Sequence, residues 1–341
     1  MGILSQVKTQ IKTRYPSQHR QLQVARWRLQ GWHRTLPHRL DPRPNAQLRE
    51  ALQVLQRDGI VVRDSAEFFG HDPRLYADAY AWAHQAWEAA RSTVAREGEQ
   101  ALTRYFFKQD KEYKIHLLPR EVPADHPFMR IALDPTLLAL VNQYMGMRTY
   151  LRAIHLWWDR PMAALPKGSQ LWHRDLDDLM NVKVFIYFND VGLGNGPFCF
   201  IPGTHPLGPR RLLRPEHDAS WRSTDEQMAQ PVPASDWKIC TAPAGTVILC
   251  DTCGLHKGLK PKRSDRLMLT IQYTSGVVPA KFMRTFEVIG EPEHGRGNAV
   301  QEWALSLNPL GLPAWLGGRA TAHNGSASPG SSAGPGEHGM I

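Results

Sequence analysis

The chain has 341 residues, of which 42% are hydrophobic and 21% charged, a composition typical of a globular protein with material for one sizeable core. Four cysteines are too few for a disulfide-stapled secreted protein, and no apolar run approaches the roughly 20 residues that a membrane span needs. The formal charge of +9 is concentrated in residues 1–43, which hold nine Lys and Arg against one acid. The remainder is close to neutral, so the charge gives no support to nucleic-acid binding, and no signal peptide is visible. We therefore expect a cytoplasmic protein that does not bind nucleic acid.

Residues 1–43 differ in character from the rest, and we predict that they form a basic helical arm. Leu4, Val7 and Ile11 fall at helical spacing, and Pro16 interrupts the pattern. One interpretation is a helical arm packed as cover on the main body. The other is a surface for an anionic membrane or an acidic partner, which makes peripheral membrane contact through this arm a hypothesis.

The main domain is predicted to span residues 44–316, and its first half contains most of the expected helices. Asn45 is a suitable N-cap for a first helix, and Gly146 is a suitable end for the last one. The expected elements are a helix over 45–55, a short strand over 60–62, a long helix over 74–97 and a helix over 136–144. These helices would flank whatever sheet the second half builds.

From about residue 148 the pattern changes to strands separated by Gly, Pro and Asn turns. The expected strands cover 149–158, 182–188, 246–249 and 267–273, with a weaker one over 282–289. We therefore predict a mainly β protein with flanking helices, folded as a double-stranded β-helix (jelly-roll) barrel. Residues 317–341 are rich in Gly, Ser, Pro and Ala, and we predict a disordered tail there.

Three residues have the types and spacing of an iron site. His173 and Asp175 are two positions apart, so in an extended segment both side chains point to the same side. His256 lies just beyond a predicted strand, and distant strands become neighbours in a jelly roll. Two imidazoles and one carboxylate on one face are the ligand set of non-haem Fe(II) oxygenases, which leaves three positions for 2-oxoglutarate and O₂. We expect His173, Asp175 and His256 to be both metal ligands and catalytic residues.

Arg266 follows His256 by ten residues and opens the next predicted strand. A planar guanidinium can hold the far carboxylate of 2-oxoglutarate through two parallel hydrogen bonds. The alternative is a surface arginine at the start of a strand. With the three ligands upstream, we predict that Arg266 binds the co-substrate.

The sequence resembles the phytanoyl-CoA dioxygenase-like family of Fe(II)/2-oxoglutarate-dependent oxygenases. The resemblance covers about residues 150–275, where order and spacing both agree, and an N-terminal stretch around LQRDGIVV at 55–62. Its motifs are WHRD at 172–175, KVFIYFNDV at 183–191, NGPF at 195–198, IPGTH at 201–205, AGTV at 244–247, HKG at 256–258 and Arg266.

This resemblance implies His173, Asp175 and His256 as iron ligands and Arg266 as the anchor of 2-oxoglutarate. It also makes Tyr187 a candidate for lining the co-substrate site. Some relatives carry a hydroxyl residue two positions after the distal histidine, where this chain has Gly258. Related halogenases replace the carboxylate ligand by a small residue, so the presence of Asp175 favours oxygen insertion.

The expected activity is hydroxylation of an unactivated C–H in a small or lipid-like metabolite, with release of succinate and CO₂. Arg210, Arg211 and Arg214 lie in a long segment, 206–241, of the kind that often forms a lid or binding loop. An anionic substrate is one interpretation of this charge, and solvated surface charge is the other. The alternative functions are a non-catalytic binding protein on the same barrel and a membrane-surface module recruited by the arm.

Overall fold

A computed structural model describes residues 24–26, 29, 38–39, 41, 43–105, 114–275, 284–290 and 299–306. The predicted tail over 317–341 and most of the predicted arm over 1–43 lie outside these residues. Their structure and the predicted membrane contact therefore stay predictions. None of the described helices is long and apolar enough to cross a bilayer.

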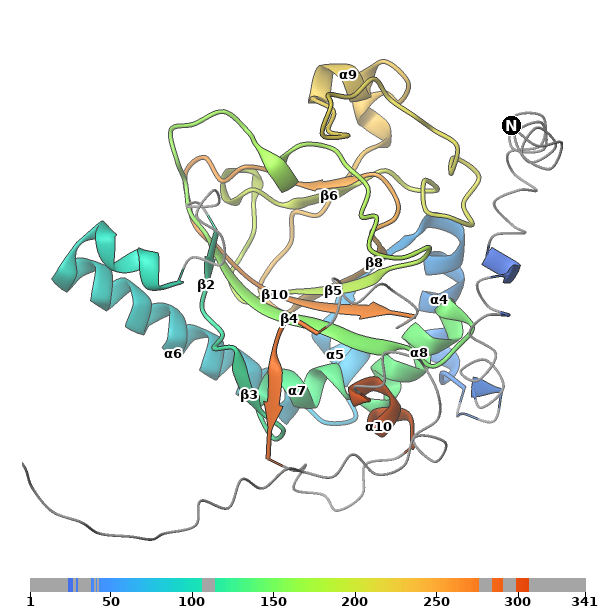
Figure 1. Cartoon of the computed structure of the whole chain (residues 1–341), viewed down its shortest axis with the longest axis horizontal. Coiled ribbons are helices and arrows are strands. Elements are labelled where there is room, and N and C mark those ends of the chain that lie inside the picture. Colours follow the sequence, from blue (N-terminus) through green and yellow to red (C-terminus); the bar gives the residue numbers. More distant parts are fainter. Residues whose placement is uncertain are drawn as a thin grey trace, which may run out of the picture.

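A six-stranded antiparallel sheet forms the centre of the molecule (Figure 1). Its spatial order is β1-β8-β5-β10-β4-β2, so strands that are distant in sequence pair with each other. The strands are β1 (Ile60–Asp64), β2 (Lys114–His116), β4 (Tyr150–Asp159), β5 (Val182–Tyr187), β8 (Thr246–Asp251) and β10 (Arg266–Thr274). The four main strand predictions are confirmed to within two residues at each end.

A smaller antiparallel sheet faces the large one across a second apolar core (Figure 1). It has the order β7-β6-β9, with β6 (Phe198–Phe200), β7 (Lys238–Ile239) and β9 (His256–Gly258). Two facing antiparallel sheets with these crossovers are the double-stranded β-helix that the sequence predicts. The remaining strands, β3 (Glu121–Pro123) and β11 (Glu287–Ile289), pair in parallel in a separate ribbon.

Helices from the N-terminal half cover the outer face of the large sheet (Figure 1). The helix of 74–97 is predicted in full, and Asn45 caps the first helix through a 2.9 Å bond from the Leu48 backbone N–H. The α-helices are α4 (Ala46–Asp58), α5 (Ser65–Phe69), α6 (Arg74–Glu97), α7 (Pro127–Ala132), α8 (Pro135–Met145), α9 (Asp225–Ala229) and α10 (Ala299–Leu305). The 3₁₀ turns are η1 (Glu99–Tyr105), η2 (Gly168–Gln170), η3 (Leu193–Asn195) and η4 (Ala234–Asp236).

Successive side chains of each central strand point to opposite faces of the sheet, so one set packs in the main core and the other set faces the site. In β10, Leu267, Leu269 and Ile271 pack in the core beneath the helices, whereas Arg266 and Met268 line a cavity on the other face. Strands β5 and β4 follow the same alternation. The apolar core therefore fixes which side chains of the large sheet face the smaller one.

Candidate metal centre

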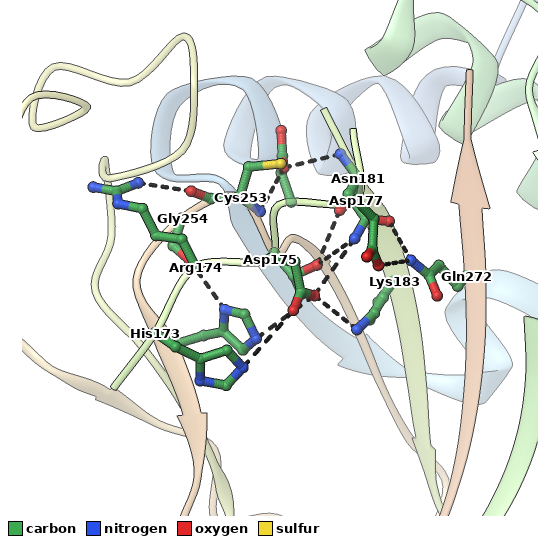
Figure 2. Close-up of polar contacts among 12 residues, drawn as sticks. His173, Arg174, Asp175, Asp177, Asn181, Lys183, Cys253, Gly254 and Gln272 are labelled. Carbon is green, nitrogen blue, oxygen red and sulfur yellow. Dashed lines mark hydrogen bonds and ion pairs between the residues drawn. The ribbon is translucent and has the colours of Figure 1, made fainter. Parts of the chain in front are cut away.

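The three predicted ligands come together in the structure and line one cavity. Figure 2 shows His173 beside Asp175. His173 and Asp175 follow η2, and His256 opens β9. His173 and His256 are paired across an antiparallel bridge, with reciprocal backbone bonds of 3.0 Å and ring centroids 4.2 Å apart. One ligand atom from each of the three residues lies within 4.8 Å of the others. The structure therefore brings together residues that are 83 positions apart along the chain.

Backbone carbonyls orient both imidazoles for metal binding. His173 Nδ1 lies 2.8 Å from the Leu171 carbonyl, and His256 Nδ1 lies 3.0 Å from the Gly254 carbonyl. Each Nδ1–H therefore donates, which leaves the Nε2 lone pair directed at Asp175, 3.8 Å from a carboxylate oxygen in both cases. Two neutral nitrogens and one carboxylate with this orientation fit Fe(II).

The charge state of the three residues also suits a metal. Burial lowers the pKa of both His173 and His256, so both imidazoles are neutral. Burial is the largest single influence on Asp175 and would raise its pKa, but Lys183, through its charge and hydrogen bond, and the two histidines together outweigh burial and hold the pKa below its usual range. Lys183 Nζ lies 2.7 Å from Asp175 Oδ2, and Asn181 Nδ2 lies 3.4 Å from the same oxygen (Figure 2). The site is thus preset with an ionised carboxylate and two unprotonated nitrogens.

Arg266 lies in the same cavity, which has a volume of about 360 Å³ and is also lined by the three candidate ligands. The guanidinium is 4% exposed and pairs with Asp159, its register partner on β4, through Nε at 3.1 Å and Nη2 at 2.7 Å. Nη1 donates to the Gly196 carbonyl. A Cβ built on Gly258 would lie 3.3 Å from Nη2, so the guanidinium lies against the glycine where some relatives have a hydroxyl residue.

The comparison with known families agrees with this geometry. A sequence model of the phytanoyl-CoA dioxygenase (PhyH) family matches residues 55–265, more than half of the chain. The chain belongs to the PhyH family. This membership makes it an enzyme of the Fe(II)/2-oxoglutarate-dependent oxygenase class, with Fe(II) and 2-oxoglutarate as its cofactors.

Several solved structures are similar to this chain. The epimerase SnoN in complex with Fe3+, alpha ketoglutarate and nogalamycin RO is 16% identical, with a TM-score of 0.45, over 74% of this chain and 93% of that one. EctD from S. alaskensis with 2-oxoglutarate and 5-hydroxyectoine is 20% identical, with a TM-score of 0.46, over 79% and 92%. AviO1 from Streptomyces viridochromogenes Tue57 is 19% identical, with a TM-score of 0.44, over 68% and 96%. No curated protein sequence matches the chain.

Tyr187, the other candidate that the PhyH resemblance suggests, is the last residue of β5 and packs in the smaller apolar core. It is fully buried, and its hydroxyl donates to the Cys240 carbonyl at 3.1 Å and accepts from the Phe198 N–H at 3.0 Å. The described residues that line the cavity do not include it. In this arrangement the phenol ties β5 to β6, and a contact with 2-oxoglutarate stays a prediction.

Two residues that support this PhyH site were not predicted from the sequence. Asp159 holds Arg266, and Lys183 holds Asp175, and both partners come from strands of the large sheet. Lys183 is a charged residue within the otherwise apolar strand β5, and Asp159 is the last residue of β4; both lie on the cavity face. A charged residue on the cavity face of a strand could have been noticed in the sequence. Its partner depends on which strands pair and in which register, and the sequence alone did not provide that.

Proposed function

We propose that the protein is a dioxygenase that hydroxylates an unactivated C–H of a small or lipid-like metabolite. In this reaction one oxygen atom of O₂ enters the product as a hydroxyl group. The other enters succinate, which forms from 2-oxoglutarate with loss of CO₂. The observation that carries the proposal is that His173, Asp175, His256 and Arg266 line one cavity.

Each of these residues has a separate task. His173, Asp175 and His256 would hold Fe(II), which supplies the activation of O₂ and the oxidative decarboxylation of 2-oxoglutarate. Arg266 would bind the far carboxylate of 2-oxoglutarate in a buried place where charge-assisted hydrogen bonds are strong. Asp175 favours oxygen insertion, because its carboxylate occupies the place that a halide would need.

The walls of the cavity leave room for a small organic substrate. Trp157, Phe185 and Phe198 provide apolar surface, whereas Thr270 and Gln272 provide polar groups on the cavity face of β10. Most of the other residues that line the cavity are polar or charged, so the wall suits a small substrate that carries both apolar and polar groups. Water would be displaced from this space by the substrate, which limits unproductive turnover.

The proposal is tested by titrating the protein with Fe(II) and 2-oxoglutarate without O₂, then admitting air in the presence of a fractionated metabolite extract. We expect succinate to exceed the background in a fraction whose component gains one oxygen atom, with about one succinate per product. The His256→Ala variant should form no substrate-dependent succinate. Substrate-dependent succinate in that variant, or a wild-type protein that never consumes 2-oxoglutarate, would contradict the proposal.

A further inference from the structure

Arg222 stands in a row with the two histidines of the metal centre. Trp172 and Ser223 form an antiparallel bridge with reciprocal backbone bonds of 3.0 Å. In an antiparallel pair the next two residues, His173 and Arg222, are opposite each other and point to the same face. His256 is opposite His173 on the other side, so the three side chains follow one another across three segments and all line the cavity.

The guanidinium of Arg222 has no hydrogen-bond or ion-pair partner within the part of the chain that the structure describes. Three other cations of the cavity have carboxylate partners: Arg266 pairs with Asp159, Lys183 with Asp175 and Arg152 with Asp177. Lys114, which also lines the cavity, lies over the Trp157 ring. Arg222 lines the same cavity as both histidines, which places it close to the metal centre. A cation that is held at a cavity wall without a partner is suited to bind an anion from outside.

A constrained turn presents this arginine. Asp218 Oδ1 accepts from the N–H groups of Ser220 and Arg222, at 2.8 and 2.9 Å, and the Asp218 N–H donates to the Arg222 carbonyl at 2.8 Å. Trp221, directly before Arg222, has φ of 61°, in the left-handed region that residues other than glycine rarely adopt. The hydrogen bonds of Asp218 hold this turn and thereby fix the backbone position of Arg222.

Arg222 and Arg266 approach the cavity from different walls. Arg266 belongs to β10 of the large sheet and lies against Gly258, two residues beyond His256 on β9. Arg222 belongs to the long segment 206–241 and lies beyond His173, on the side away from β9. One 2-oxoglutarate molecule that chelates the metal and reaches Arg266 therefore leaves Arg222 available for a second molecule.

We propose that Arg222 binds the acidic group, a carboxylate or a phosphate, of the organic substrate. The proposal rests on the proposed oxygenase function and specifies its substrate class as an organic acid. The apolar part of that acid would lie along Trp157, Phe185 and Phe198. Binding the acid at Arg222, beside His173, would hold the carbon chain near the metal centre.

Equilibrium dialysis of matched acid and amide probes tests the proposal. The protein is held without O₂ in Fe(II) and saturating 2-oxoglutarate, so that Arg266 is occupied. The probes are phenylacetate and phenylacetamide, octanoate and octanamide, and phenyl phosphate as the second kind of acid. We expect the wild type to bind at least one acid about tenfold or more tightly than its neutral counterpart, the range of a charge-assisted hydrogen bond.

The Arg222→Gln variant should lose this preference, and Arg222→Lys should keep part of it. The control is Arg214→Gln, which removes the same charge from an exposed place in the same segment and should keep the preference. The affinity for 2-oxoglutarate should stay within about twofold in the Arg222→Gln protein. Circular dichroism establishes that each variant is folded.

Three results would overturn the inference: no acid preference in any pair, a preference that survives Arg222→Gln, or equal weakening of 2-oxoglutarate and acid probes in that variant. The last result would assign Arg222 to the co-substrate. An Arg266→Gln protein separates the two proposals, because it should bind 2-oxoglutarate poorly and still prefer acids through Arg222. A wild type that prefers acids through Arg222 and never binds 2-oxoglutarate would support the acid site and contradict the oxygenase proposal.

Discussion

Arg266 enters the cavity as one half of a buried ion pair, because Asp159 occupies two of its donor groups at 3.1 and 2.7 Å. Burial by itself would lower the pKa of Arg266, but the carboxylate of Asp159 raises it, so the charge is maintained. The pair also fixes the plane of the guanidinium. A fixed plane favours two-point binding of a carboxylate over binding by a mobile cation.

Replacing Arg266 by Gln should raise the KM for 2-oxoglutarate by roughly 30-fold or more, since the loss of a buried charge-assisted pair costs about 2–5 kcal/mol. Iron affinity should change little, because Arg266 is not a ligand. Steady-state kinetics with 2-oxoglutarate as the varied substrate measures this effect, and Arg263→Gln, at an exposed arginine nearby, is the control. The double variant Arg266→Gln with Asp159→Asn removes both buried charges and keeps the test valid if the single variant unfolds. An unchanged KM would mean that another residue holds the far carboxylate.

At the scale of single residues, the combination of motifs in the sequence was enough to predict which side chains the structure brings into one cavity. His173 and Asp175 are separated by one residue, and Arg266 follows His256 by a spacing that the PhyH resemblance shares. Arg222 has no such signal, because its place in the cavity follows from a bridge between segments 51 residues apart. Its neighbours Arg210, Arg211 and Arg214 are equally basic in sequence, and none of them lines the cavity within the described residues.

The elements follow from the sequence where they are long and depend on tertiary pairing where they are short. Helix α6 is 24 residues long and rich in alanine, so the sequence alone was enough to predict where it begins and ends. Strands β6, β7 and β9 have three residues or fewer, and so few positions show no period of two. They form because β6 hydrogen-bonds to both of its neighbours and Phe198 and Phe200 pack in the core between the sheets.

The junction between α4 and β1 depends on Gly59. Its φ is +78°, and a Cβ would lie 2.5 Å from the His205 ring, which packs over it. Gly59→Ala should therefore lower the free energy of unfolding by about 3 kcal/mol, through both backbone strain and overlap. Gly290→Ala is the control, because Gly290 has φ of +76° with no atom within 4 Å of the built Cβ, and about 1 kcal/mol is expected there. Urea denaturation measures both, and equal losses would show that the contact with His205 does not matter.

On the scale of the whole molecule, the two faces of the large sheet have different functions. Helices from the N-terminal half bury one face, and the other face carries the cavity and its charged groups (Figure 1). The basicity of the chain lies mainly in residues 1–43, and the remaining residues together are close to neutral. Among the described residues, the cavity gathers charged side chains, three of whose cations form ion pairs with carboxylates, whereas the guanidinium of Arg222 has no such pair.

The central claim is that a single Fe(II) ion binds to His173, Asp175 and His256, and anaerobic equilibrium dialysis against Fe(II) tests it most directly. The wild type and a His217→Ala control, which removes an exposed histidine, should each bind one iron per chain. The His256→Ala and Asp175→Ala proteins should stay folded and bind iron at least about 100-fold more weakly, since even outer partners of a ligand contribute 10- to 100-fold. A wild type without bound iron, or a folded His256→Ala protein that retains one iron at unchanged affinity, would contradict the claim.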